Sequence, residues 1–223
     1  MAVVKLFLFG TPRLECDGAG VRIPRRKALA LLAYLAATDR AHARDTLAAL
    51  FWPDHGQGEA RLALSRHLSA VNKALPAGIL LLEPERVAVS ADLWVDVRAF
   101  TAGTDAAAPA PVNLPALQAI ADLYSADFLA GYTVAGCPDF DASQTLEAEH
   151  LRRRLRAVLE TLAWAHAAAG RAEQASATAS RWLALDPLDE VAHHALMQLF
   201  ASAGQKAAAL RQYEQCRQLL VLE

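Results

Sequence analysis

The side chains whose types and spacing suit a chemical role gather in one segment, residues 59–75. On a helix of about 100° per residue, its apolar side chains share one narrow stripe, formed by Leu64, Leu68, Val71 and Leu75. The opposite face collects Glu59, Leu62, Ser65, Arg66, Ser69 and Lys73, with Arg61 and Asn72 on one flank and His67 on the other. The segment is therefore predicted to be an amphipathic helix that buries its leucine stripe.

The face opposite that stripe carries side chains that suit the major groove of DNA. Arg and Lys pair with guanine acceptors or with phosphates, Ser reaches phosphates, and Leu62 would touch a thymine methyl group. An ordinary amphipathic helix with a solvated polar face has a similar composition, so the helix pattern alone leaves both interpretations open. The basic run Arg25, Arg26 and Lys27 is open in the same way, because it either meets phosphates or is simply solvated.

Short extended segments precede the first predicted helix. Alternating apolar residues indicate a strand over residues 4–9, and further extended segments follow at 13–16 and 21–24, separated by turns that contain glycine. Helices are then predicted over residues 28–37 and 44–52, ahead of the amphipathic helix.

A hairpin is predicted after the amphipathic helix. Residues 79–82 and 86–89 are extended segments on either side of the turn Glu83-Pro84-Glu85. Short strands, then three helices, then a hairpin is the order of a winged helix, a helix-turn-helix variant whose third helix enters the major groove. Residues 1–98 are therefore expected to form an α+β winged-helix domain with a small N-terminal sheet and a wing.

Residues 99–223 are predicted to form an all-helical domain. Prolines indicate a linker over residues 101–115, and helices follow it, the longest over about 140–168. The pair Ala-Gly at 169–170 returns at 203–204, a spacing of 34 residues. That spacing is the period of tetratricopeptide (TPR) repeats, in which small residues let paired helices approach. The whole chain is thus predicted to be mainly α, a winged helix followed by a TPR-like domain.

Composition argues against several classes of protein. Apolar residues make up 54% of the chain, enough for packed cores, yet charged residues interrupt every run long enough to span a membrane. The cysteines are scattered without metal-ligand spacing, and no catalytic motif is present. We therefore expect a cytoplasmic protein that is not an enzyme and has no membrane partner, metal site or cofactor.

The charge of the chain divides unevenly between the two predicted domains. Residues 1–98 carry 13 Lys and Arg against 10 Asp and Glu, whereas residues 99–223 carry 9 against 14. A polyanion such as DNA is therefore expected to meet the first half.

Several longer runs are distinctive and together cover nearly the whole chain. They are residues 6–12, 23–36, 44–54 with Trp-Pro-Asp at its end, 60–69 and 95–100 in the first half, and 123–131, 186–197 and 207–214 in the second. These runs resemble the Streptomyces antibiotic regulatory protein (SARP) family, whose members join a winged helix to a bacterial transcriptional activation domain (BTAD). In that family the activation domain extends beyond the position of residue 223, so the resemblance implies a shortened domain here.

The resemblance implies a DNA-binding transcription regulator that acts as an activator. It implies binding to direct repeats in double-stranded promoter DNA through the winged helix. The helical domain is then expected to contact RNA polymerase or a sigma factor, or a second protomer of a homodimer. The expected DNA contacts are Arg61, Leu62, Ser65, Arg66, Ser69, Asn72 and Lys73, together with Arg25, Arg26 and Lys27.

One departure from the family lowers the expected affinity for DNA. The family usually ends its recognition helix in a doubly basic pair, whereas here Asn72 precedes Lys73. Glu59, Glu83 and Glu85 also add negative charge near the expected phosphates. Because phosphate neutralisation supplies much of DNA affinity, the alternative is a protein-interaction scaffold or signalling module whose winged helix has lost strong DNA binding.

Overall fold

The computed structural model describes residues 2–107 and 113–221, which form two compact units. The first unit comprises the residues up to Ala102 together with Leu123–Leu151. The second comprises Gly103–Asp122 and the residues from Arg152 onward. Helix α6 (Pro138–Ala168) therefore contributes its first part to one unit and the remainder to the other.

Two small sheets belong to the first unit. One has the order β3-β2-β1-β7 and is built from β1 (Val4–Phe7), β2 (Arg13–Cys16), β3 (Ala19–Val21) and β7 (Leu93–Val95). The pairing of β1 with β7 is parallel, and the other pairings are antiparallel. The second sheet has the order β4-β6-β5 and is built from β4 (His42–Ala43), β5 (Leu80–Leu82) and β6 (Arg86–Val89). Its β5–β6 hairpin confirms the predicted wing.

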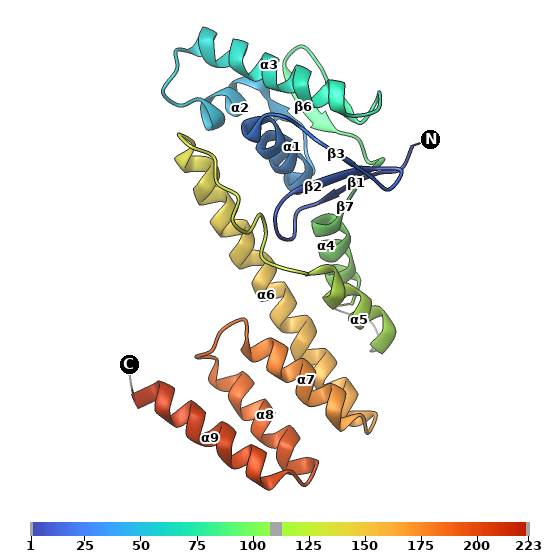
Figure 1. Cartoon of the computed structure of the whole chain (residues 1–223), viewed down its shortest axis with the longest axis vertical. Helices are drawn as coiled ribbons and strands as arrows, with labels where there is room; N and C mark the ends of the chain where they lie inside the picture. Colours follow the sequence, from blue (N-terminus) through green and yellow to red (C-terminus); the bar gives the residue numbers. More distant parts are fainter. Residues whose placement is uncertain (1, 108–112, 222–223) are drawn as a thin grey trace. The chain divides into compact units, whose positions relative to one another are not determined.

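The helices predicted between the strands are present. They are α1 (Arg26–Thr38), α2 (Arg44–Phe51) and α3 (Gln57–Ala74). Helix α1 is the centre of the core, because its side chains Leu31, Leu32 and Leu35 are fully buried. Helix α3 packs against both α1 and α2 and covers α1 from the outside (Figure 1). Strands, three helices and a wing confirm the predicted winged-helix order.

The predicted linker over residues 101–115 is wrong for most of its length. Helix α4 (Asp96–Ala107) runs through the first part, and α5 (Leu114–Leu123) begins before its end. The helix forms because Val97 and Phe100 are buried on one face, and this apolar pattern outweighs the turn-forming residues around it. Pro115 lies in the first turn of α5, where the amide hydrogen that proline lacks has no partner within the helix. Pro109 and Pro111 lie outside the described residues.

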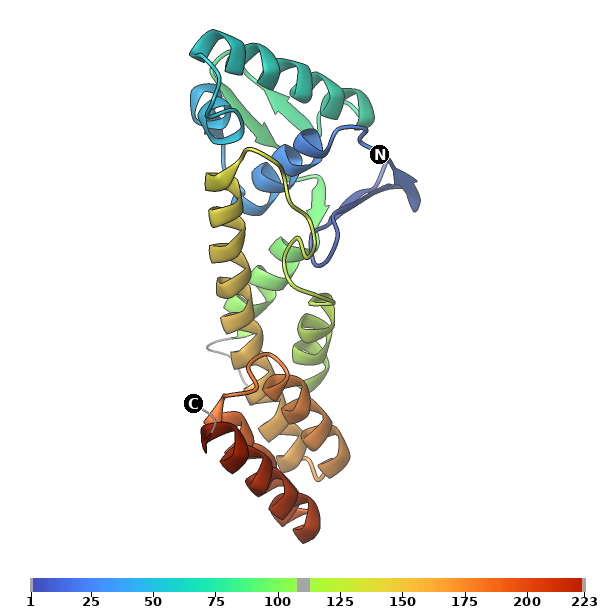
Figure 2. The ribbon, with the colours of Figure 1, turned by 60° about the vertical axis from the view of Figure 1, so that its left-hand side comes forward.

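The second unit contains successive helices that run antiparallel (Figure 2). After α6 come α7 (Ala172–Leu183), α8 (Glu190–Ser202) and α9 (Lys206–Val221). Two of the turns have the same geometry: Gly170 and Gly204 both have positive φ, at 72° and 76°. The following amide of each turn donates back five residues, from Arg171 to His166 O at 2.9 Å and from Gln205 to Phe200 O at 2.8 Å. The 34-residue spacing in the sequence thus corresponds to a repeated helix end.

One buried cluster between these helices is rich in alanine. Its buried residues are Ala163, Ala175, Ala179, Leu196 and Leu199. Alanines at these positions let neighbouring helices approach closely, as expected for a helical repeat.

In the described part of the chain, no helix combines the length and apolar character needed to cross a bilayer.

A buried carboxylate joins the N-terminal sheet to α4. Asp96 is 3% exposed and accepts hydrogen bonds from the backbone N–H of Leu8 at 2.8 Å, Phe9 at 3.0 Å and Val97 at 2.8 Å. Burial raises the pKa of Asp96, while the hydrogen bonds from these amides act in the opposite direction. The side chain therefore satisfies the backbone where the chain leaves β1 and where α4 begins.

We expect Asp96→Ala to be strongly destabilising. The substitution leaves three buried N–H groups without an acceptor, so the free energy of unfolding should fall by about 3 kcal/mol or more. Urea denaturation followed by circular dichroism measures this change. Asp92→Ala is the control, because Asp92 is exposed and bonds only locally with Ser90. Equal losses for the two variants would contradict the role assigned to Asp96.

Candidate nucleic-acid interface

Helix α3 is oriented by its apolar stripe. Ala60, Leu64, Leu68 and Val71 are buried, and Leu75 at the end of the helix is buried as well. The predicted inward face is therefore confirmed. The residues predicted to contact DNA from this helix are all exposed, and we call them the outward face: Arg61, Leu62, Ser65, Arg66, Ser69, Asn72 and Lys73.

The outward face combines positive charge with one large apolar side chain. Leu62 is 61% exposed, although leucine elsewhere in this helix is buried. In residues 2–107 and 113–221, no carboxylate lies within ion-pair distance of Arg66 or Lys73. The hydroxyl of Ser65 donates to the carbonyl oxygen of Arg61 at 2.9 Å, which leaves its lone pairs available as acceptors. Two cations without carboxylate partners and an exposed apolar side chain on the same helix face suit phosphate and base contacts.

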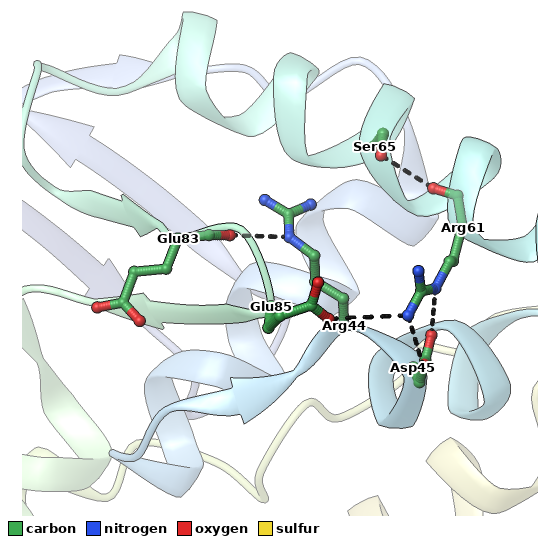
Figure 3. A network of polar contacts seen from close by, with 6 residues as sticks. All are labelled: Arg44, Asp45, Arg61, Ser65, Glu83 and Glu85. Carbon is green, nitrogen blue, oxygen red and sulfur yellow. Dashed lines mark hydrogen bonds and ion pairs between the residues drawn. The ribbon is translucent and has the colours of Figure 1, made fainter.

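Arg61 differs from the other cations of this face because carboxylates hold it. Its guanidinium pairs bidentately with Asp45 of α2, through Nε to Oδ1 and through Nη2 to Oδ2 at 2.7 Å (Figure 3). Nη2 also lies 3.8 Å from Oε2 of Glu85 in the wing turn. The hydrogen bond from Arg61 lowers the pKa of Asp45, and the attraction between the two charges acts in the same direction. Arg61 therefore reaches any phosphate only in competition with two carboxylates.

The same contacts tie the wing to the start of α2. The backbone N–H of Arg44 donates to Glu85 O at 2.9 Å, and Nε of Arg44 donates to Glu83 O at 3.0 Å (Figure 3). With the ion pairs of Arg61, these bonds connect α2, α3 and the wing. The wing turn thus has a defined position beside α3. Sequence reasoning missed Asp45, because an exposed pair separated by sixteen residues has no periodic signature.

The basic run at the start of α1 is not part of the outward face. Nη2 of Arg26 donates to Thr133 O at 3.1 Å, and its guanidinium lies 4.5 Å from the centre of the Tyr132 ring. Nζ of Lys27 donates to Phe51 O at 2.8 Å and lies 5.4 Å from the Trp52 ring. The prediction that this run contacts DNA stays untested, and its observed partners are carbonyl oxygens and aromatic rings.

His67 lies on the flank of α3 that faces this basic run. Its ring packs 4.8 Å from the Trp52 ring, and Nδ1 lies 2.7 Å from Ala63 O. Burial lowers the pKa of His67, and the positive charges of Arg25 and Lys27 lower it further, against the hydrogen bond to Ala63. On the helix, His67 is rotated about 100° from Arg66. The histidine therefore belongs to a second surface, distinct from the outward face.

A segment predicted to lie in the helical domain packs on the winged-helix elements. The amide of Leu129 donates to Leu8 O at 2.8 Å, and that of Gly10 donates to Asp127 O at 2.9 Å. Tyr124 packs on Phe9 with ring centres 4.5 Å apart. Sequence reasoning missed these contacts because they join residues more than a hundred positions apart.

The described residues contain no group of three or more His, Cys, Asp or Glu side chains arranged to hold a metal ion.

The fold has a relative among solved structures. EmbR of Mycobacterium tuberculosis, solved in complex with a low affinity phosphopeptide, matches with a TM-score of 0.77 and 21% sequence identity. The match covers 100% of this chain and 61% of the EmbR chain, so this chain spans less than two thirds of EmbR. At this identity the likeness shows the fold, a winged helix joined to a helical domain. A comparison with curated protein sequences gives no match.

The sequence also matches a family directly. The model of the bacterial transcriptional activator domain family matches residues 92–223, more than half of the chain. This match begins one residue before β7, just ahead of the buried carboxylate of Asp96, and runs through the helical repeats. The chain therefore belongs to the bacterial transcriptional activator domain family, a family of transcription regulators rather than of enzymes, as its resemblance to the SARP family predicted.

Proposed function

We propose that the protein is a transcription activator that binds direct repeats in promoter DNA through the outward face of α3. The observation that carries this proposal is the pair of cations without carboxylate partners, Arg66 and Lys73, on the exposed side of the third helix of a winged helix. In such domains the third helix enters the major groove, and the wing lies beside it. Ser69 and Asn72 supply hydrogen-bonding groups between the cations, and Leu62 supplies an apolar contact.

The helical domain has the role of contacting protein in this proposal. Residues 99–223 carry 9 Lys and Arg against 14 Asp and Glu, a charge that opposes DNA binding. Its partner is RNA polymerase with its sigma factor, or a second protomer seated on the adjacent repeat. Residues 1–98 and 99–223 are then two functional domains, and the regulator acts in the cytoplasm, where the promoter DNA is.

The alternative is a winged helix that binds protein instead of DNA. The observation that favours it is the position of Asp45 and Glu85, which compensate the charge of Arg61. Asn72 also stands where the family usually has a second cation. Binding to duplex DNA at low salt separates the two functions, because the protein-binding alternative predicts none.

We expect Arg66→Ala and Lys73→Ala each to weaken DNA binding. Each variant removes one contact to the DNA. If the contact is to a base, the binding free energy should weaken by about 1–3 kcal/mol. If it is to a phosphate, the slope of log affinity against log salt concentration should fall by about one unit. A gel-shift titration on a direct repeat, repeated over a range of salt concentrations, measures both quantities. Arg153→Gln on the exposed side of α6 is the control for loss of a positive charge. No binding by the unmodified protein at low salt would overturn the proposal.

We expect Asp45→Asn to strengthen DNA binding. The substitution removes the closer of the two carboxylates beside Arg61, so only Glu85 still competes with a phosphate for the guanidinium, and one repulsive charge is lost. The salt dependence should become steeper by about one unit, since one more phosphate is neutralised. Asp54→Asn removes a charge from the exposed loop before α3 without touching Arg61 and serves as the control. Equal effects of the two variants would show that Arg61 is not restrained by Asp45.

A further inference from the structure

A pocket of about 580 Å³ lies beside α3 in the first unit, away from the outward face. Three consecutive basic residues, Arg25, Arg26 and Lys27, line one part of it. His67 of α3 lines another part, and the backbone segment Thr133–Ala135 completes the lining. None of these lining residues is acidic. Pockets of this volume hold small organic molecules.

The positive charges at this pocket form no ion pairs with carboxylates of the described residues. Arg26 and Lys27 bond to carbonyl oxygens, of Thr133 and Phe51, and these bonds leave both side chains with their full charge. Helix α1 begins at Arg26 and has no acidic residue in its first turn, so the positive end of its dipole adds to that of the side chains. Within the described residues, no ion pair involves Arg25, Arg26 or Lys27. The pocket is therefore a site of concentrated positive potential.

The bonds of Arg26 and Lys27 also fix the shape of the pocket. The ring of Tyr132 stacks on the Arg26 guanidinium, and its hydroxyl donates to Arg26 O at 2.8 Å. Nζ of Lys27 is held between Phe51 O and the Trp52 ring. Two of the cations are thus ordered before any ligand arrives, which lowers the entropic cost of binding. Arg25 lines the pocket, is exposed, and is therefore accessible to a ligand.

We propose that this pocket binds a small organic phosphate. A phosphoryl group carries up to two negative charges and accepts several hydrogen bonds, which matches three cations and the open end of a helix. The volume exceeds that of a single phosphate, so the pocket has room for an organic part of the ligand beside the exposed Ala135. The site does not use the outward face of α3, because none of its lining residues belongs to that face and His67 is rotated about 100° around α3 from Arg66.

His67 reports directly on occupancy of the pocket. Burial lowers the pKa of His67, and the charges of Arg25 and Lys27 lower it further. A bound phosphoryl group places negative charge beside the ring, so the pKa of His67 should rise on binding.

The experiment uses pyrophosphate as the probe and the His67 ring resonance as the readout. The whole chain is titrated with pyrophosphate at constant ionic strength, and the pKa of His67 is measured by NMR with and without the probe. We expect saturable binding, a higher pKa of His67, and an affinity reduced roughly tenfold in Arg25→Gln, the effect of one charge-assisted hydrogen bond. Arg22→Gln removes an exposed charge three residues away, outside the pocket lining, and should leave the affinity unchanged.

Three results would overturn the proposal. The first is an absence of saturable binding, and the second is an equal loss of affinity in Arg22→Gln and Arg25→Gln, which would indicate diffuse attraction. The third is a shift of His67 by a short random-sequence DNA duplex but not by pyrophosphate, because the pocket would then contact the DNA backbone. Failure of DNA binding in the gel-shift titration affects none of these outcomes, so the two proposals fail separately.

Discussion

The segment over residues 124–133 packs on the winged-helix elements, and its position depends on one buried carboxylate. Asp96 satisfies the amides of Leu8 and Phe9, and this fixes the chain where it leaves β1. Phe9 then packs against Phe100 and Tyr124, with ring centres 5.5 and 4.5 Å apart. The segment that follows Tyr124 continues over the winged helix until it reaches the start of α1. Removing this carboxylate would leave three buried amides without an acceptor. The chain therefore strongly favours the one arrangement in which Asp96 meets all three.

The cations of the first unit fall into groups with different partners. Arg61 is paired with carboxylates, and these ion pairs connect α2, α3 and the wing, so its charge is compensated within the domain. Arg26 and Lys27 bond to neutral groups, and their charge remains available to a small anion. Arg66 and Lys73 project from the outward face. The net charge of the first half hides this division, because only the partners of each side chain show which charges can act on a ligand.

Local patterns were predictable from the sequence, and long-range contacts were not. The leucine stripe of α3, the wing hairpin and the 34-residue repeat all have short periods that a sequence shows directly. The strands β4 and β7 are too short to show alternation. The second half of α4 falls in the predicted linker, because the nearby prolines outweigh the apolar face that includes Phe100. The outward face was predicted residue by residue, but the pairing of Arg61 with Asp45 depends on how α2 and α3 pack.

The most direct test of DNA binding is protection of guanine N7 in the major groove. A duplex selected from a random pool by the whole chain is treated with dimethyl sulfate, with and without the protein. If α3 enters the major groove, guanines should be protected in repeated clusters spaced by about one helical turn, roughly 10–10.5 base pairs, and Arg66→Ala should remove protection at defined positions. Failure to select any sequence, or a bound duplex whose guanines stay fully reactive, would contradict the assignment of α3 as the recognition helix.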